Sequence, residues 1–179
     1  MVEIYRELAT FERLPPPDEE EAVRLGAMIF DAGRLEGLVA EVDGCIEGMA
    51  IFSEGIGSSF RARPMIFLED LAVTEAVRSQ GVGAALMAAL AREGVRRGAL
   101  RMEWAVLDWN VDAIRFYRRL GAGPRKDWVQ YTLEAEAMWR LAEGSSRRLI
   151  RSGRPRGASP RDGPRRSAAR PARRGRTSP

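Results

Sequence analysis

The chain has 179 residues, of which 45% are hydrophobic, and a net charge of +4, which suits one folded domain with a remainder. It has no histidine and one cysteine, Cys45, which excludes a Ser-His or Cys-His nucleophile, a histidine-ligated metal and an internal disulfide. Acid–base chemistry must then use carboxylates, tyrosine, water or the single lysine, Lys126.

Two helices are predicted at the start of the chain. Apolar residues between Ile4 and Phe11 recur at helical spacing, which predicts a helix over residues 3–13. Three consecutive prolines end this helix. Asp18 then provides an N-cap for a second helix, whose first turn is acidic.

A mixed sheet is predicted downstream. Asp43-Gly44 lies between two strand-like runs and indicates a hairpin, and the apolar run at residues 65–73 predicts a strand buried on both faces. A helix that opens at Gly81 separates this strand from the next, which predicts a parallel crossover. The element order is typical of an α/β (α+β) fold with helices on both faces of a mixed sheet. The predicted strands are residues 37–42, 45–52, 65–73, 100–106 and 128–133, and the helices after them are residues 81–97, 110–120 and 134–142.

Residues 144–179 differ in composition from the rest. They hold twelve arginines and one acid, Asp162, so their net charge is +11; because the whole chain carries +4, residues 1–143 carry −7. The segment offers too little apolar surface to offset the entropy of folding, so we expect a disordered Arg/Pro/Gly-rich tail after a domain that spans residues 1–143. No aromatic residues alternate with these arginines, so nucleic-acid binding by the tail is not expected. The acidic domain favours cationic partners.

The most informative segment is a glycine-rich turn between a buried strand and a helix, Arg78-Ser-Gln-Gly81-Val-Gly83. Glycine lets the backbone turn tightly and approach a ligand, and the free N–H groups of the next helix favour an anion such as a pyrophosphate. The turn lacks the Lys-Ser/Thr of a Walker loop and the third glycine of a dinucleotide fingerprint. A Gly-x-Gly pair alone is also compatible with a purely structural turn.

A second motif joins the glycine turn: Asn110, Ala113, the aromatic pair Phe116-Tyr117, and then Leu-Gly. With both motifs, the sequence resembles the GNAT N-acetyltransferases over about residues 3–133. The resemblance implies direct acetyl transfer from acetyl-CoA, as a co-substrate, to an amine, with no metal. It implies that acetyl-CoA is held by Leu71, Ala72, Val73, Arg78, Ser79, Gln80, Gly81, Val82, Gly83, Ala84, Asn110 and Ala113.

Within that family the chain is most similar to the spermidine/spermine (diamine) acetyltransferases, through segments such as Leu68-Glu69-Asp70. This implies a small cationic amine acceptor, Tyr117 as the general acid beside the CoA sulfur, and Glu69 as the carboxylate acting on the amine. An alkyl amine has a pKa near about 10.4, so a carboxylate that attracts it and accepts its proton suits the chemistry. The predicted substrate contacts are Phe11, Glu12, Glu69 and Asp127.

Alternatives remain open at several positions. Tyr117 also fits a packed core position. Glu69 and Asp70 are adjacent in a strand, so they are expected to face opposite sides, with one of them structural. The acceptor is alternatively a lysine-like amino acid such as thialysine, or the chain is an inactive binding protein with this fold. The short loop that carries Arg125 and Lys126 weakens the case for a polyamine.

The family's opening strand is missing from this sequence, which predicts that the strand at residues 37–42 forms a sheet edge. We expect a cytoplasmic protein, because the N-terminus is charged rather than typical of a signal peptide. A membrane partner is not expected, since no apolar run approaches the ~20 residues of a membrane span. The resemblance also suggests a homodimer.

Overall fold

The computed structural model describes residues 1–57 and 62–144. The chain divides into two compact units, one spanning Met1–Lys126 and one that begins at Asp127. Except for Gly144, the predicted disordered tail lies outside the described residues. No helix within the described ranges is long and apolar enough to cross a membrane.

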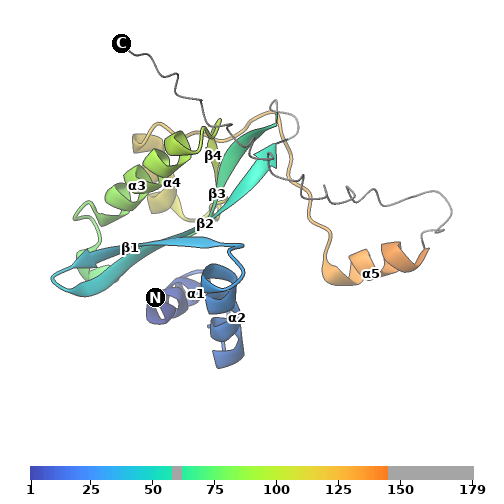
Figure 1. Cartoon of the computed structure of the whole chain (residues 1–179), viewed down its shortest axis with the longest axis horizontal. Helices are drawn as coiled ribbons and strands as arrows, with labels where there is room; N and C mark the ends of the chain where they lie inside the picture. Colours follow the sequence, from blue (N-terminus) through green and yellow to red (C-terminus); the bar gives the residue numbers. More distant parts are fainter. Residues whose placement is uncertain (58–61, 145–179) are drawn as a thin grey trace, which may run out of the picture. The chain divides into compact units, whose positions relative to one another are not determined.

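The first unit is built on a four-stranded mixed sheet in the order β1-β2-β3-β4 (Figure 1). β2 pairs antiparallel with both β1 and β3, whereas β3 and β4 are parallel, which confirms the predicted parallel crossover. β1 forms an edge of the described sheet, as predicted. The strands are β1 (Glu36–Val42), β2 (Cys45–Gly57), β3 (Arg63–Val73) and β4 (Met102–Glu103).

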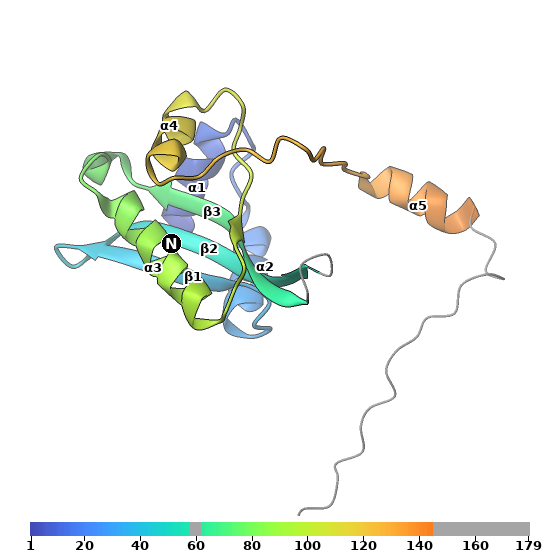
Figure 2. The same ribbon diagram turned by 90° about the horizontal axis from the view of Figure 1, so that it is seen from above.

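Helices cover both faces of this sheet, which confirms the predicted α/β architecture. α1 and α2 lie on one face, and α3 and α4 lie on the other (Figures 1 and 2). A short 3-10 helix, η2 (Glu75–Val77), connects β3 to α3, and α5 (Ala135–Gly144) belongs to the second unit. The helices of the first unit are α1 (Val2–Phe11), α2 (Glu19–Phe30), α3 (Val82–Arg96) and α4 (Val111–Arg119).

Two hydrophobic cores hold the helices on the sheet. On the α3 face, Leu86 and Leu90 belong to the same buried cluster as Leu68 of β3. On the α1 face, Ile4 packs in a cluster with Ala72 of β3. β3 therefore contributes to both cores, which confirms that this strand is buried on both faces. Each fully buried leucine or isoleucine side chain contributes about 1.5–3 kcal/mol to the stability of the fold.

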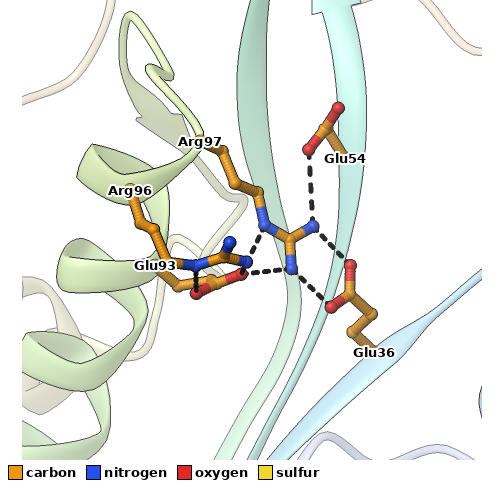
Figure 3. Close-up of polar contacts among 5 residues, drawn as sticks. All are labelled: Glu36, Glu54, Glu93, Arg96 and Arg97. Carbon is orange, nitrogen blue, oxygen red and sulfur yellow. Dashed lines mark hydrogen bonds and ion pairs between the residues drawn. The ribbon is translucent and has the colours of Figure 1, made fainter. Parts of the chain in front are cut away.

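Arg97, the residue that follows α3, fastens this helix to the sheet. Its guanidinium donates hydrogen bonds to Glu36 of β1, to Glu54 of β2 and to Glu93 one turn earlier in α3 (Figure 3). The hydrogen bond from Arg97 lowers the pKa of Glu36. The Arg97 side chain is only 16% exposed, and a charge with so little solvent is costly to leave unpaired. The cluster thus favours one position of the α3 C-terminus against β1 and β2.

The structure corrects two predicted strands and one helix end. Residues 128–133 form no strand, and Trp128, Val129 and Tyr131 are exposed. The alternating apolar pattern of these residues fits a strand, but a strand forms only where a neighbouring strand provides partners for its backbone hydrogen bonds. β4 comprises two residues rather than 100–106, and α1 ends at Phe11 because Arg13 takes a left-handed φ of 62°.

Candidate active site

The glycine turn after β3 leaves the N-terminus of α3 open to a ligand. Ser79 and Gly81 both take left-handed backbone angles, with φ of 65° and 91°, so the chain reverses within a few residues. No side chain caps the first turn of α3. The free N–H groups of this turn and the helix dipole therefore offer a site for an anion.

A cavity of about 790 Å3, called here the larger cavity, lies against this turn, α1, the end of β3 and α4. This volume is in the range of small-molecule sites. Two of the residues predicted for acetyl-CoA do not line it: Gln80 donates its side-chain amide to Ala76 O, and Val82 packs into the α3 core. The predicted residues that do line it are Leu71, Ala72, Val73, Arg78, Ser79, Gly81, Gly83, Ala84, Asn110 and Ala113.

β3 has an open flank beside the larger cavity. Its ladder with β4 consists of Ile66 with Met102 and Phe67 with Glu103. Beyond Phe67, β3 pairs only with β2 among the described residues. Residues 71–73 line the cavity, so main-chain groups on this side of β3 are available to a ligand that lies alongside it, except the Val73 carbonyl, which accepts a hydrogen bond from Arg78 Nε at 3.0 Å.

Asn110 and α4 place Tyr117 at the larger cavity. The Asn110 side chain caps α4 by accepting a hydrogen bond from the Ala113 N–H at 3.1 Å. Tyr117 lies two turns later, and its ring packs against Trp104 with the ring centroids 5.0 Å apart. Burial, and then the negative charge of Glu12, raise the pKa of Tyr117. Tyr117 is thus both a packing residue and a phenol held in its protonated form.

Three arginines line the larger cavity: Arg78, Arg115 and Arg119. The motif identified Arg78, whereas Arg115 and Arg119 were missed. Their spacing of four residues on one helix places both on the same face of α4, and that signal could have indicated them. Two acidic residues, Glu7 and Asp112, also line this cavity, and Asp112 lies 3.6 Å from Arg115. The lining therefore has a small excess of positive charge, which complements a phosphorylated ligand.

A second cavity of about 400 Å3, called here the smaller cavity, lies between α1, α2 and β3. Its polar lining consists of Tyr5, Glu12, Glu21, Arg24 and Asp70. Burial, and then the charges of Glu12 and Glu69, raise the pKa of Asp70 to about 6. This carboxyl therefore titrates close to neutral pH and is a stronger base than an ordinary aspartate.

A β-bulge corrects the expectation that Glu69 and Asp70 face opposite sides. Ile51 of β2 pairs with Asp70 and the next residue, Phe52, pairs with Leu68, so Glu69 is an extra residue in β3. Glu69 is exposed and accepts a hydrogen bond from the Ser53 hydroxyl at 2.9 Å. Because of the bulge, both carboxylates lie on the α1 face, but only Asp70 lines a cavity described here.

The remaining predicted substrate contacts are separated by the structure. Phe11 lines the larger cavity, and its ring contacts Trp109 with the centroids 5.5 Å apart. Glu12 lines the smaller cavity. Asp127 starts the second unit, so it is not placed relative to either cavity. Within the described ranges, no three acidic or cysteine side chains gather as metal ligands.

The two cavities adjoin at α1 and β3. Leu8 lines both of them. Asp70 lines the smaller cavity, and the next residue, Leu71, lines the larger one. A glycine-rich cavity with a small excess of positive charge thus shares Leu8 of α1 with a mainly acidic cavity.

Comparisons with known proteins identify the family of this fold. Residues 1–122 match the model of the Acetyltransferase (GNAT) family. An L-ornithine N5-acetyltransferase of Arabidopsis thaliana is 40% identical over 80 residues, which cover 45% of this chain and only 35% of the plant protein. A thialysine N-epsilon-acetyltransferase of Mus musculus is 32% identical over 154 residues, which cover 79% of this chain and 89% of the mouse protein.

Solved structures share the fold. An integron cassette protein from the mobile metagenome of V. cholerae superimposes with a TM-score of 0.70 at 21% identity, covering 79% of this chain and 89% of that protein. An aminoglycoside N-acetyltransferase in complex with CoA superimposes with a TM-score of 0.60 at 25% identity, covering 73% of this chain and 87% of that one.

Proposed function

This chain belongs to the acetyltransferase (GNAT) family, and we propose that it transfers the acetyl group of acetyl-CoA to the side-chain amine of a lysine-like amino acid such as ornithine or thialysine. The observation that carries the proposal is the pair of adjoining cavities. The larger one suits a phosphorylated acetyl donor, and the smaller one suits a cationic acceptor. The donor and acceptor would meet where Asp70 and Leu71 follow one another in β3.

The larger cavity fits acetyl-CoA, which supplies a thioester carbonyl for direct attack by an amine. The uncapped first turn of α3 and Arg78 would hold the pyrophosphate. The main-chain groups of residues 71–73 that point away from β2, apart from the Val73 carbonyl that Arg78 occupies, would bind the pantetheine arm as an added strand binds a sheet edge. An N–H group there would also stabilise charge on the carbonyl oxygen.

Asp70 is the proton acceptor in this proposal, in place of the Glu69 suggested by the sequence. The amine pKa of about 10.4 makes deprotonation at neutral pH cost about 4–5 kcal/mol, so a nearby base is needed. Asp70 lines the acceptor cavity and its pKa is raised to about 6, whereas Glu69 is exposed and bonded to Ser53. The carboxylate attracts the ammonium group and then takes its proton, directly or through one water.

Tyr117 is the donor to the leaving thiolate in this proposal. Its raised pKa keeps the phenol protonated at neutral pH. A thiolate of pKa about 8.5 is a weaker base than a tyrosinate, so full proton transfer from Tyr117 costs at least about 2 kcal/mol. A strong hydrogen bond from the Tyr117 hydroxyl to the leaving sulfur therefore fits the energetics better than complete proton transfer, which would leave a tyrosinate.

The names of the relatives support a lysine-like amino acid over a diamine as the acceptor. The plant and mouse relatives are named for ornithine and thialysine, two amino acids with a side-chain amine. The diamine acceptor suggested by the sequence remains the second candidate, because Glu12, Glu21 and Asp70 would also attract a diamine.

An acceptor panel tests the proposed function. The protein is mixed with acetyl-CoA and either L-ornithine, thialysine, putrescine or spermidine, and release of the CoA thiol is followed with a thiol-reactive dye. We expect faster release with the two amino acids than with the two polyamines. Release with polyamines alone would select the second candidate, and release with none of the four would contradict both.

A further inference from the structure

Arg24 is a feature of the smaller cavity that the acetyl-transfer chemistry does not use. Among the described residues that line this cavity, it is the one cationic side chain. It projects from α2, and its Nη1 lies 2.6 Å from a carboxylate oxygen of Glu20. Its Nη2 lies 3.8 Å from Glu21, and the side chain is 52% exposed.

The charges around the smaller cavity match an amino acid better than a diamine. Three carboxylates, Glu12, Glu21 and Asp70, line the cavity together with the guanidinium of Arg24. At neutral pH a diamine carries two ammonium groups and no anion. A lysine-like amino acid carries two ammonium groups and one carboxylate, so it offers a partner for Arg24 as well as for the acids.

We propose that the Arg24 guanidinium binds the α-carboxylate of the acceptor and selects amino acids over diamines. This inference rests on the proposed function, because it concerns the acceptor of that reaction. Arg24 lies on α2 and Asp70 on β3, so the two ends of the acceptor have different partners. The amino-acid head faces α2, and the side-chain amine faces Asp70 and the donor cavity beyond it.

The present partners of Arg24 leave it able to bind a ligand. Glu20 is 82% exposed, and exposed ion pairs of this kind are weak. Glu21 already accepts a hydrogen bond from the Asp18 N–H at 3.0 Å in the capping box at the start of α2. A planar guanidinium with five donors can hold a carboxylate through two parallel hydrogen bonds, and this geometry is stronger than a single contact.

L-ornithine and putrescine provide a matched pair of ligands, because putrescine is ornithine without its α-carboxylate. Their binding to the CoA-loaded protein is measured by calorimetry for the parent, for Arg24→Gln and for a control, Arg6→Gln. Arg6 also forms an exposed ion pair within a helix, with Glu3 at 2.7 Å, but it lines neither cavity. Arg24→Gln should weaken L-ornithine binding about tenfold or more and should not weaken putrescine binding, because the diamine has no carboxylate and the lost guanidinium only repels its ammonium groups. Arg6→Gln should change neither.

Two results would overturn the role of Arg24. One is a parent protein that binds L-ornithine no more tightly than putrescine, and the other is an Arg24→Gln variant in which both ligands weaken by the same factor. Acetyl transfer is measured separately on the same proteins. If Arg24→Gln acetylates L-ornithine as fast as the parent does at a low substrate concentration, that result contradicts this inference alone. If no amine is acetylated, the proposed function is contradicted. Calorimetry then still decides whether Arg24 binds the carboxylate.

Discussion

Replacing Asp70 with asparagine removes the proton acceptor proposed for the amine and keeps the size of the side chain. Burial and the charges of Glu12 and Glu69 raise the pKa of Asp70 from 3.8 to about 6. A shift of roughly two pKa units corresponds to about 3 kcal/mol, which we discount to about 1–2 kcal/mol because the side chain is only half-buried and solvent screens it. Loss of a positioned base lowers kcat/KM by a factor of about a hundred or more.

The assay is the dependence of kcat/KM on pH between about pH 5 and 9. For the parent, kcat/KM should rise about tenfold per pH unit below about pH 6, where Asp70 is protonated, and stay level above it. For Asp70→Asn, kcat/KM should rise about tenfold per pH unit across the whole range, because only the small deprotonated fraction of the amine substrate then reacts. A variant that keeps the level region, or stays within about threefold of the parent at pH 7, would refute Asp70 as the base. The control Glu69→Gln should stay within about threefold of the parent, because Glu69 lines neither cavity.

The same substitution should stabilise the fold at neutral pH. The folded pKa of Asp70 lies above its ordinary value, so its contribution to stability is present at low pH and is lost as the pH rises from about 4 to about 6. At pH 7 the charged carboxylate is therefore a cost to the fold that asparagine does not carry. Asp70→Asn should raise the free energy of unfolding by about 1–2 kcal/mol at pH 7 and by less at pH 4, as measured by urea denaturation.

Tyr117→Phe should lower turnover about ten- to a thousandfold with little change in acetyl-CoA affinity, because only the proton donor is lost; turnover within about twofold of the parent would show that Tyr117 only packs. Gly81→Asp should weaken CoA binding, measured by calorimetry, far more than Gly81→Asn, since both side chains meet the same left-handed φ of 91° and only aspartate adds a negative charge. Equal losses in these two variants would argue against an anion site. Arg97→Gln should lower the free energy of unfolding by about 1–3 kcal/mol, and Arg96→Gln, whose side chain is 70% exposed, should lower it much less. Equal effects of the two arginine substitutions would show that the contacts of Arg97 with the sheet do not hold α3.

The elements with local signals could be predicted from the sequence. The Asp43-Gly44 pair marks the turn between β1 and β2, and both residues have positive φ. Asp18 caps α2 and forms a capping box with Glu21. Such signals depend on residues within a few positions of one another, so one sequence is enough to find them.

The arrangement of the carboxylates could not be predicted, because it depends on the register between two strands. Alternation along a regular strand places Glu69 and Asp70 on opposite faces. The pairing of β2 with β3 instead makes Glu69 a bulge residue, and no residue pattern within β3 predicts this bulge. The smaller cavity likewise arises where α1, α2 and β3 meet, so Arg24 belongs to no sequence motif.

The segment at residues 128–133 shows the limit of pattern alone. Trp128, Tyr131 and Leu133 are strand-forming or apolar residues, yet all three are exposed and the segment has no regular structure. Strand propensity expresses how well a side chain fits a half-buried, paired surface, and the sequence does not say whether a partner strand is present.

A crystal structure of the protein with CoA and L-ornithine would test most directly whether donor and acceptor meet across β3. We expect the CoA sulfur in the larger cavity within hydrogen-bond reach of the Tyr117 hydroxyl, and the side-chain amine of ornithine in the smaller cavity within reach of Asp70. Both separations should then be about 2.6–3.5 Å, directly or through one water. An amine that binds at Glu69, or a CoA sulfur that lies away from Tyr117, would contradict the mechanism proposed for this enzyme.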